Sequence, residues 1–416
     1  MDILVGVIVG LLVLMLLVTA HEFGHFIMAR RNGVKVLEFG IGFPPKAIAW
    51  VKDAKTGKWK RLPKSEWKKP QKGLIFSLNW LPIGGFCQMD GESAEDERAG
   101  TFGAASFWTK TKILFGGVAM NWLLAFVILT ILAWTGMPEF LEGQFTIDSD
   151  TRRNDIAVVV EKVAEGSPAE KAGFLEGDKI IKIGGESFTR LADFAAYNEV
   201  HAGEVANYTV LRYGTGYCDG KMTVKECEPT EHEQDLLAQL NGTEAEYLLG
   251  VSMWAEEGLS YSTWSAPIVG AGLTLQITGE TFKGLGDLVW NLISGVGAQL
   301  SFDSSVRDAG KESISTVGES VSGPVGIIGT LFPSFTAAGP TNLAFLAAII
   351  SISLACMNVL PIPALDGGRW LLIAIYKIRK KKLTKEIEEK IVSRAFMVLL
   401  AIMFIITILD VVRIVK

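Results

Sequence analysis

The chain has 416 residues, of which 49% are hydrophobic and 20% are charged, with a formal net charge of −5. This balance is too apolar for an average soluble protein, and the apolar residues gather in long runs. The sequence contains no internal repeat and no nucleic-acid-binding motif, so nucleic acid is not an expected partner.

The first apolar run, Ile3–Ala20, continues directly into the sequence His-Glu-Phe-Gly-His at positions 21–25. The run approaches the ~20 residues that a membrane-spanning helix needs, so we expect a first span over residues 1–29. On that helix His21 and His25 share one face and can bind one zinc ion, while Glu22 can act as a general base. Ionisable groups are costly in a membrane unless they have partners, and a metal ion is such a partner.

Two other interpretations of this junction are weaker. A secretory signal peptide would end near Ala20, but the chain opens with Met1-Asp2, lacks a basic n-region, and returns to an apolar pattern at Phe26. A chance pairing of histidines on an interfacial helix is disfavoured because the whole chain has only four histidines.

Residues 30–110 contain two glycine-interrupted stretches, Gly40–Ala49 and Leu74–Phe86, that are typical of short strands. We expect a small β-sheet on the cytoplasmic side that re-enters the membrane beside the metal. Its exposed edge would bind the substrate as an additional strand. A juxtamembrane loop without a catalytic role is the alternative.

Three further apolar runs predict spans over residues 111–137, 342–362 and 395–413. The stretch Lys52–Lys72 holds nine basic residues against two acidic ones, and the loop at residues 377–394 begins almost solidly basic. The positive-inside rule places both in the cytoplasm, and it places the long acidic segment between spans two and three outside together with both termini. The histidine motif then lies inside the membrane, toward the cytoplasm.

Residues 155–254 have the composition of a soluble domain. Val158–Val160 predicts a strand, Gly166–Gly173 a turn with a short helix, and Leu175–Gly185 a turn with an alternating strand. This order is similar to a PDZ domain of the bacterial, circularly permuted type, which implies binding of a peptide or C-terminus by strand addition. A purely structural PDZ domain is the alternative.

Residues 255–340 predict an amphipathic helix and a linker. The helix, over Thr274–Ile293, is expected on the outer membrane surface or on the PDZ domain, and Asp303–Glu319 is expected to be polar and flexible. Cys218 and Cys227 flank a predicted hairpin turn on the exported side, so a disulfide between them is an open possibility.

A third zinc ligand is expected from a carboxylate, because His201 and His232 fall in the exported segment. Asp410, near the outer end of span four, is interpreted as an interfacial residue. Asp366 follows span three at the cytoplasmic level, among prolines and glycines that break the helix, which a membrane tolerates where backbone lines a cavity. Asp366 is therefore our candidate, and a plain loop with Asp366 as a helix cap is the alternative.

Together these motifs resemble the site-2 protease family of intramembrane zinc proteases (peptidase family M50-like), most closely its bacterial regulator-of-sigma-E type. The similarity rests on four segments, which are His21–His25, Leu81–Glu92, Ser322–Ile327 and Asn358–Gly368. The second is similar to the family's membrane-re-entrant β-loop. One departure is the stretch Gly117–Ala125, which lacks the proline common in the family; it keeps Asn121, interpreted as an interhelical hydrogen-bonding residue.

The resemblance implies a site with one Zn²⁺ ion. The metal ligands it implies are His21, His25 and Asp366, with Glu22 as the catalytic base. The substrate-binding residues it implies are Asn358, Pro361, Gly84, Gly85 and Phe86.

The expected fold is a polytopic α-helical membrane protein with four spans, a small membrane-re-entrant β-sheet and one exported α/β PDZ domain. The expected function is zinc-dependent endoproteolysis within or near the transmembrane segments of single-span membrane proteins, such as a pre-clipped anti-sigma factor, or of remnant signal peptides. A site-1-type protease that acts first and membrane lipid are the other expected partners, and the expected location is the inner (plasma) membrane. A catalytically inactive PDZ scaffold and a secreted soluble zincin are the alternatives.

Overall fold

The computed structural model of the chain describes most of its residues. They are 2–53, 56–67, 69, 71, 73–92, 96–141, 143–189, 191–214, 230–242, 248–255, 258–299 and 323–415. These residues form two compact units, one of Met1–Leu132 with Pro267–Lys416 and one of Ala133–Ala266. The predicted disulfide between Cys218 and Cys227, the segment Asp303–Glu319 and residue Ser322 lie outside the described residues.

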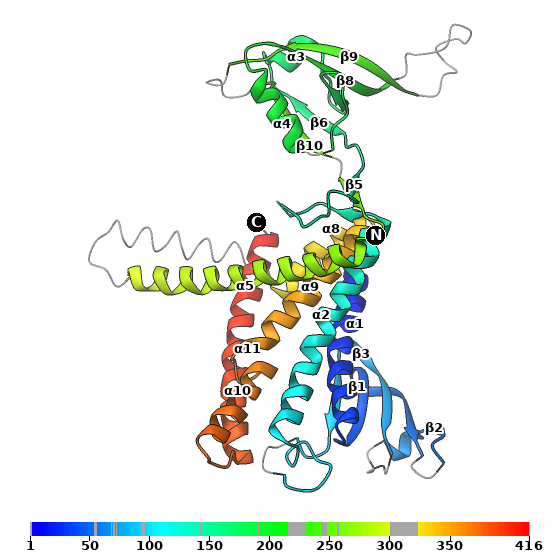
Figure 1. Cartoon of the computed structure of the whole chain (residues 1–416), viewed down its shortest axis with the longest axis vertical. Coiled ribbons are helices and arrows are strands. Elements are labelled where there is room, and N and C mark those ends of the chain that lie inside the picture. The colour runs from blue at the N-terminus through cyan, green and yellow to red at the C-terminus, as the bar shows by residue number, and fades with distance from the viewer. Residues whose placement is uncertain are drawn as a thin grey trace. The chain divides into compact units, whose positions relative to one another are not determined.

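Among the described residues, four helices are long and apolar enough to cross a membrane. They are α1 (Asp2–Arg31), α2 (Phe107–Thr135), α9 (Pro340–Val359) and α11 (Lys385–Val415), which run side by side in Figure 1. The prediction of four spans is confirmed, and the chain is a multi-pass membrane protein. The basic loop expected at 377–394 is shorter than predicted, because α10 (Asp366–Ile378) precedes it and α11 already begins at Lys385.

Shorter helices pack against these spans. The chain runs through α7 (Pro324–Gly326), a π-helical turn η2 (Ile327–Leu331) and α8 (Phe332–Ala337). This segment lies against α1 at two glycines, since a Cβ on Gly6 would fall 2.4 Å from Pro333 and one on Gly10 would fall 2.6 Å from the Phe332 ring. Small residues thus let the two helices approach closely.

The amphipathic helix expected at Thr274–Ile293 is longer, because α5 spans Ala266–Gln299. Its first half packs on α2, where a Cβ on Gly270 would meet Thr130. Its second half leaves Val289, Trp290 and Ile293 exposed.

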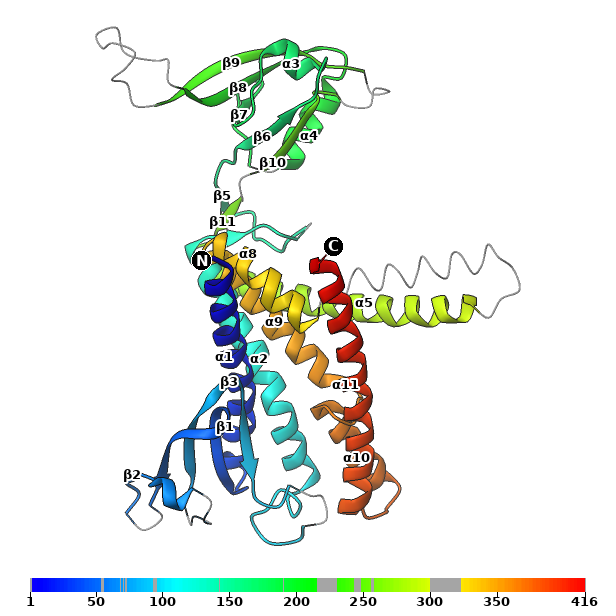
Figure 2. The same cartoon turned by 180° about the vertical axis from the view of Figure 1, so that it is seen from behind.

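A three-stranded sheet lies beside the lower half of α1 (Figure 2). It is built from β1 (Val36–Lys52), β2 (Trp59–Arg61) and β3 (Ile75–Met89) in the order β2-β1-β3, with a 3₁₀ turn η1 (Lys64–Glu66) after β2. The first half of β1 pairs with both halves of β3, since Phe39 is in register with Phe76 and with Cys87. The final part of β3 therefore has β1 on one side only.

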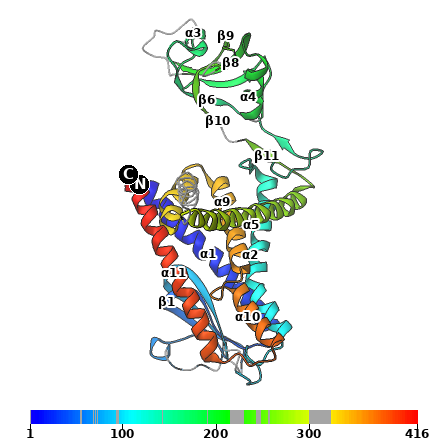
Figure 3. The same cartoon turned by 90° about the vertical axis from the view of Figure 1, so that its left-hand side faces the viewer.

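One apolar core joins the sheet, the end of α1, the start of α2 and α10. Its buried members are Ala29, Val34, Val36, Phe39, Leu74, Cys87, Met89, Phe102, Ile113, Leu114, Ile373 and Leu383. Trp370 of α10 also donates from its indole nitrogen to Thr111 of α2 at 2.9 Å, and Figure 3 shows these two helices next to each other. This core fixes the start of α10 against α1 and α2.

The described residues of the second unit form two sheets and two helices. A five-stranded sheet has the order β10-β6-β7-β8-β9, and a small sheet has the order β4-β11-β5. The strands and helices are β4 (Met137–Pro138), β5 (Arg152–Arg153), β6 (Val158–Val163), α3 (Pro168–Ala172), β7 (Lys179–Ile183), α4 (Leu191–Val200), β8 (Val205–Gly214), β9 (Thr230–Gln239), β10 (Val251–Ala255) and β11 (Leu259–Tyr261). Ile180, Phe194 and Tyr208 are fully buried at its centre.

Candidate metal centre

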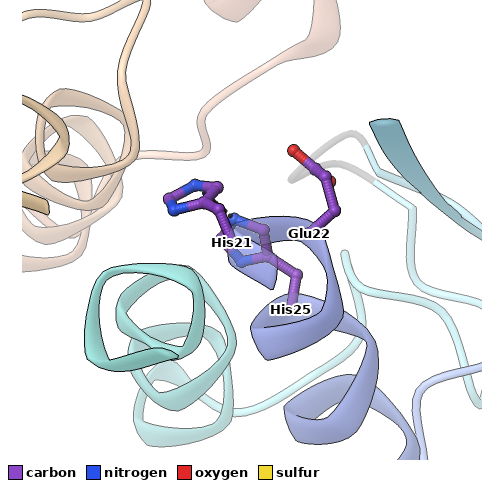
Figure 4. Close-up of side chains that lie close together, drawn as sticks. All are labelled: His21, Glu22 and His25. Atoms are coloured by element: carbon purple, nitrogen blue, oxygen red, sulfur yellow. Dashed lines mark hydrogen bonds between the residues drawn. The ribbon is translucent and has the colours of Figure 1, made fainter. Parts of the chain in front are cut away.

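The helix α1 carries three of the predicted site residues. His21 and His25 are one helical turn apart, so their imidazoles lie together on one face, with ring centroids 4.7 Å apart (Figure 4). One ligand atom from each of His21, Glu22 and His25 lies within 4.8 Å of the others. Both imidazoles are buried, at 8% and 7% exposure.

Asp366, at the first position of α10, completes the group from a point 341 residues further along the chain than His25. Its Oδ2 lies 3.0 Å from His21 Nε2 and 3.2 Å from His25 Nε2, and the two Nε2 atoms are 3.1 Å apart. Three ligand atoms thus form a triangle with sides close to the roughly 3.3 Å that separates ligands around a tetrahedral zinc ion. The carboxylate accordingly lies where the sequence predicted a third ligand.

A hydrogen bond from its other ring nitrogen orients the imidazole of His25. Its Nδ1 lies 2.8 Å from the carbonyl oxygen of Ile113 in α2 and donates to it, because a carbonyl can only accept. That tautomer leaves the Nε2 lone pair directed at His21 and Asp366, which is the arrangement that metal-binding histidines adopt. The donor set therefore fits a zinc ion.

Glu22 lies next to the two imidazoles on the same turn of α1 (Figure 4). Its Oε2 accepts a hydrogen bond of 3.0 Å from the backbone N–H of Cys87 in β3. The sheet therefore fixes the rotamer of Glu22 through a backbone amide on the side of β3 that pairs with none of the described strands.

Comparison with known proteins identifies the family to which the chain belongs. The model of peptidase family M50 matches residues 9–63 and 56–403, which is most of the chain. The chain belongs to peptidase family M50. It is similar over 98% of its length to proteins named putative zinc metalloprotease from Clostridium perfringens (27% identical), Clostridium acetobutylicum (28%) and Staphylococcus aureus strain MRSA252 (25%), and covers 98%, 97% and 98% of those chains.

In this M50 peptidase, glycines that the sequence analysis did not single out let α1 and α2 meet at the site. A Cβ on Gly24 would fall 2.1 Å from the carbonyl oxygen of Gly116. A Cβ on Gly117 would fall 2.7 Å from both His21 Cε1 and His25 Nε2. The pair of adjacent glycines in α2 was the available signal, but its partner could not be known without the helix crossing.

Two more glycines support Asp366. A Cβ on Gly367 would fall 2.1 Å from the carbonyl oxygen of Val359, and one on Gly368 would fall 2.0 Å from that of Ile362. The turn after α9 therefore lies directly on the first turn of α10. This contact explains why glycines follow the aspartate, since any side chain there would push Asp366 away.

The predicted substrate-binding residues occupy two places. Gly84 and Gly85 are buried where β3 meets α1, with Cβ positions 3.0 Å from Val18 and 3.1 Å from Thr19 Oγ1 respectively, and Phe86 covers Gly40 of β1. These residues thus lie one turn of α1 before His21. Asn358 is half-buried and Pro361 is exposed, in the last turn of α9 and the turn that leads to Asp366.

Two polar residues differ from expectation. Asp410 is not an exposed interfacial side chain, because it is 3% exposed and accepts hydrogen bonds from the backbone N–H groups of Gly323, which caps the start of α7, and Gly326, which ends it. Asn121 is fully buried, but its interhelical contact uses its backbone carbonyl, which accepts from Ser351 at 2.9 Å. Its amide has no hydrogen-bond partner among the described residues.

Proposed function

We propose that this chain is an intramembrane zinc endopeptidase that cleaves within or near the transmembrane segments of single-span membrane proteins. The observation that carries the proposal is the triangle of His21 Nε2, His25 Nε2 and Asp366 Oδ2, with sides of 3.0–3.2 Å. Both histidines are on α1, a helix long and apolar enough to span a membrane. Membership of a peptidase family and the zinc metalloprotease names of the relatives support it.

His21, His25 and Asp366 would hold the zinc ion, and Glu22 would be the general base. Zinc bound there would act as a Lewis acid and lower the pKa of water to about 7. Glu22 would take up a proton from the attacking water and deliver it to the leaving amine of the cleaved peptide bond. The Cys87 amide, 3.0 Å from Oε2, would hold Glu22 in position for both transfers.

The sheet β2-β1-β3 would dip into the membrane and present the substrate to this site. Large apolar side chains at its tip support this, since Phe43, Trp80, Leu81 and Ile83 are all exposed. In the part of the chain that the structure describes, no strand pairs with the final part of β3 on the side facing Glu22. A substrate segment unwound from its helix would satisfy its freed backbone groups by pairing there, with Asn358 and Pro361 holding it from the other side.

The five-stranded unit would be a PDZ domain that binds a peptide or C-terminus. Its strand β10 supports this, because β10 is at the edge of the sheet and β6 is its one neighbour among the described strands. Met253 and Trp254 of β10 are exposed at this edge. A peptide would add there as a further strand.

The protein would reside in the inner (plasma) membrane, with the basic segments around the sheet and after α10 in the cytoplasm. The PDZ domain would then be outside, where it would exclude substrates until a site-1-type protease removes their bulky exported part. Pre-clipped anti-sigma factors and remnant signal peptides would fit this requirement.

The test is cleavage of a purified single-span model substrate in detergent, with zinc content measured on the same samples. Glu22→Gln keeps the size of the side chain and an acceptor for the Cys87 amide, and Glu386→Gln on the exposed start of α11 is the matched control. We expect one zinc per chain in all three proteins and a rate lowered roughly 10²–10⁴-fold in Glu22→Gln alone, the usual contribution of general acid–base catalysis. Wild-type protein that binds zinc but cleaves no tested substrate would favour the inactive PDZ scaffold, and wild-type protein without zinc would contradict the metal site.

A further inference from the structure

One arginine joins three separate parts of the first unit. Arg369 lies one turn after Asp366 on α10, and its Nε donates to Glu388 Oε1 of α11 at 3.1 Å. Its Nη2 donates to the backbone carbonyl of Glu92, just beyond the end of β3. Glu388 is only 6% exposed, so this ion pair is largely removed from solvent.

An aromatic ring lies against this guanidinium. The carbon Cζ of Arg369 lies 4.9 Å from the centroid of the Phe102 ring, and Phe102 is fully buried. Lys110 of α2 lies 5.7 Å from the same ring, while its Nζ donates to the carbonyl of Gly103 at 2.7 Å. A flat, delocalised guanidinium stacks on such a ring and donates from two edges at once, which a lysine ammonium cannot do.

Arg369 also stands beside the site. A cavity of about 900 Å³ is lined by Asp366, Arg369, Glu92 and Glu388 together with neighbouring charged residues. The first turn of α10 forms one of its walls, and neither Arg369 nor Glu388 is a candidate metal ligand. Movement of the first turn of α10 in this cavity would displace the Asp366 carboxylate from the histidines.

The contacts of Arg369 connect the third metal ligand with the general base. Glu92, whose carbonyl Arg369 holds, accepts from the backbone N–H of Met89 at 2.9 Å through its side chain. Met89 ends β3, and Cys87 two residues earlier holds Glu22. Asp366 on α10 and Glu22 on α1 are thus positioned by structures that meet at one guanidinium.

We propose that Arg369 is a positioning residue. It fixes α10 to the end of β3 and to α11, so that the side chains of Asp366 and Glu22 keep their positions around the metal. This inference rests on the proposed function, since it assigns Arg369 a task in that same site. Residues outside the ligand set that orient the ligands typically contribute 10–100-fold to metal affinity or activity.

The test compares Arg369→Gln, which loses the charge, with Arg369→Lys, which keeps the charge but cannot make both contacts. Glu388→Gln weakens the contact of Arg369 to α11 and leaves its contact to the Glu92 carbonyl in place. The matched control is Lys382→Gln, which breaks an ion pair with Glu97 whose two side chains are 85% and 78% exposed. Each protein is measured for the rate at which it releases zinc to a chelator, and for kcat and KM with the single-span model substrate.

We expect Arg369→Gln to release zinc 10–100-fold faster than wild type and to lose kcat by a similar factor, with KM changed by less than about threefold. Arg369→Lys and Glu388→Gln should fall between Arg369→Gln and wild type, and Lys382→Gln should match wild type. Zinc release and kcat of Arg369→Gln equal to those of wild type would overturn the inference while leaving the protease assignment intact.

Thermal unfolding in detergent shows whether each variant is folded. Should Arg369→Gln fail to fold, the two milder variants decide, and wild-type zinc release in both would overturn the inference. Wild-type protein that holds no zinc would overturn the proposed function and this inference together.

Discussion

The interiors of the two units of this chain are packed in different ways. In the second unit, bulky side chains such as Tyr208, Phe194 and Ile180 fill the interior, as in a soluble domain whose stability comes from burying apolar surface. In the first unit, α1 and α2 meet at Gly24 and Gly117, where there is no space for even a methyl group. Adding atoms should therefore damage the first unit, whereas removing polar partners or apolar volume should damage the second unit.

The reason lies in the solvent. Lipid tails are as apolar as leucine, so membrane helices gain little from burying large side chains and instead associate by close backbone approach and polar contacts. The candidate metal site combines close backbone approach with polar contacts. The glycines bring α1 and α2 together, and the imidazoles of His21 and His25 occupy the space that a side chain at Gly117 would fill. Metal binding and helix packing should therefore fail together in the first unit.

The largest effect should come from Gly117→Ala. The added Cβ would lie 2.7 Å from His25 Nε2 and from His21 Cε1, so one of the imidazoles must move. We expect loss of bound zinc and roughly a 100-fold loss of cleavage, since a displacement of about 1 Å at a reacting centre has that effect. Zinc content and cleavage rate are the measurements.

The matched control for that substitution is Gly279→Ala on α5, where nothing lies within 4 Å of the added Cβ. It should bind zinc and cleave as wild type does. Full zinc content in Gly117→Ala would refute the close approach of α2 to the histidines.

An intermediate effect is expected for Arg212→Met in the second unit. Arg212 donates to both oxygens of Asp178, at 2.7 and 2.6 Å, and Asp178 is 1% exposed. The same hydrogen bonds raise the pKa of Arg212. The substitution leaves a buried carboxylate without its cation, so we expect the second unit to lose about 3 kcal/mol of unfolding free energy, while the zinc content of the protein is unchanged.

Limited proteolysis of the folded protein, followed with increasing denaturant, measures that change. Lys182→Met is the control, because its ion pair with Glu233 is exposed on both sides and should contribute less than about 1 kcal/mol. Equal losses in the two variants would contradict the structural role of the Asp178–Arg212 pair.

The smallest effect is expected for Tyr208→Phe. Burial raises the pKa of Tyr208, so its hydroxyl stays protonated and donates to Asn198 Oδ1, which is also buried. The substitution keeps the ring and removes this one hydrogen bond, so we expect a loss of about 1–2 kcal/mol without a change in cleavage. The same proteolysis experiment measures it, and a stability equal to that of wild type would show that the hydrogen bond contributes nothing net.

Much of the membrane architecture could be predicted from the sequence, because long apolar runs and helical spacing are local properties. The four spans and the common face of His21 and His25 follow from them. Asp366 could be proposed as well, since few carboxylates occur in apolar surroundings. The structure then brings it within 3.2 Å of both histidines.

Contacts between distant segments could not be predicted in the same way. The meeting of Gly24 with Gly116 and Gly117 depends on where two helices cross, and no single segment encodes that point. Asp410 illustrates the same limit, because its position near the end of a span suggested an interface. Its buried hydrogen bonds to Gly323 and Gly326 depend on how α7 packs against α11.

X-ray absorption at the zinc edge of the purified wild-type protein shows directly whether His21, His25 and Asp366 hold one zinc ion. We expect one zinc per chain with only nitrogen and oxygen ligands, two of them imidazoles, at about 2.0–2.2 Å. A sulfur ligand at about 2.3 Å would refute this site, because it would mean that a cysteine and not these three residues holds the metal.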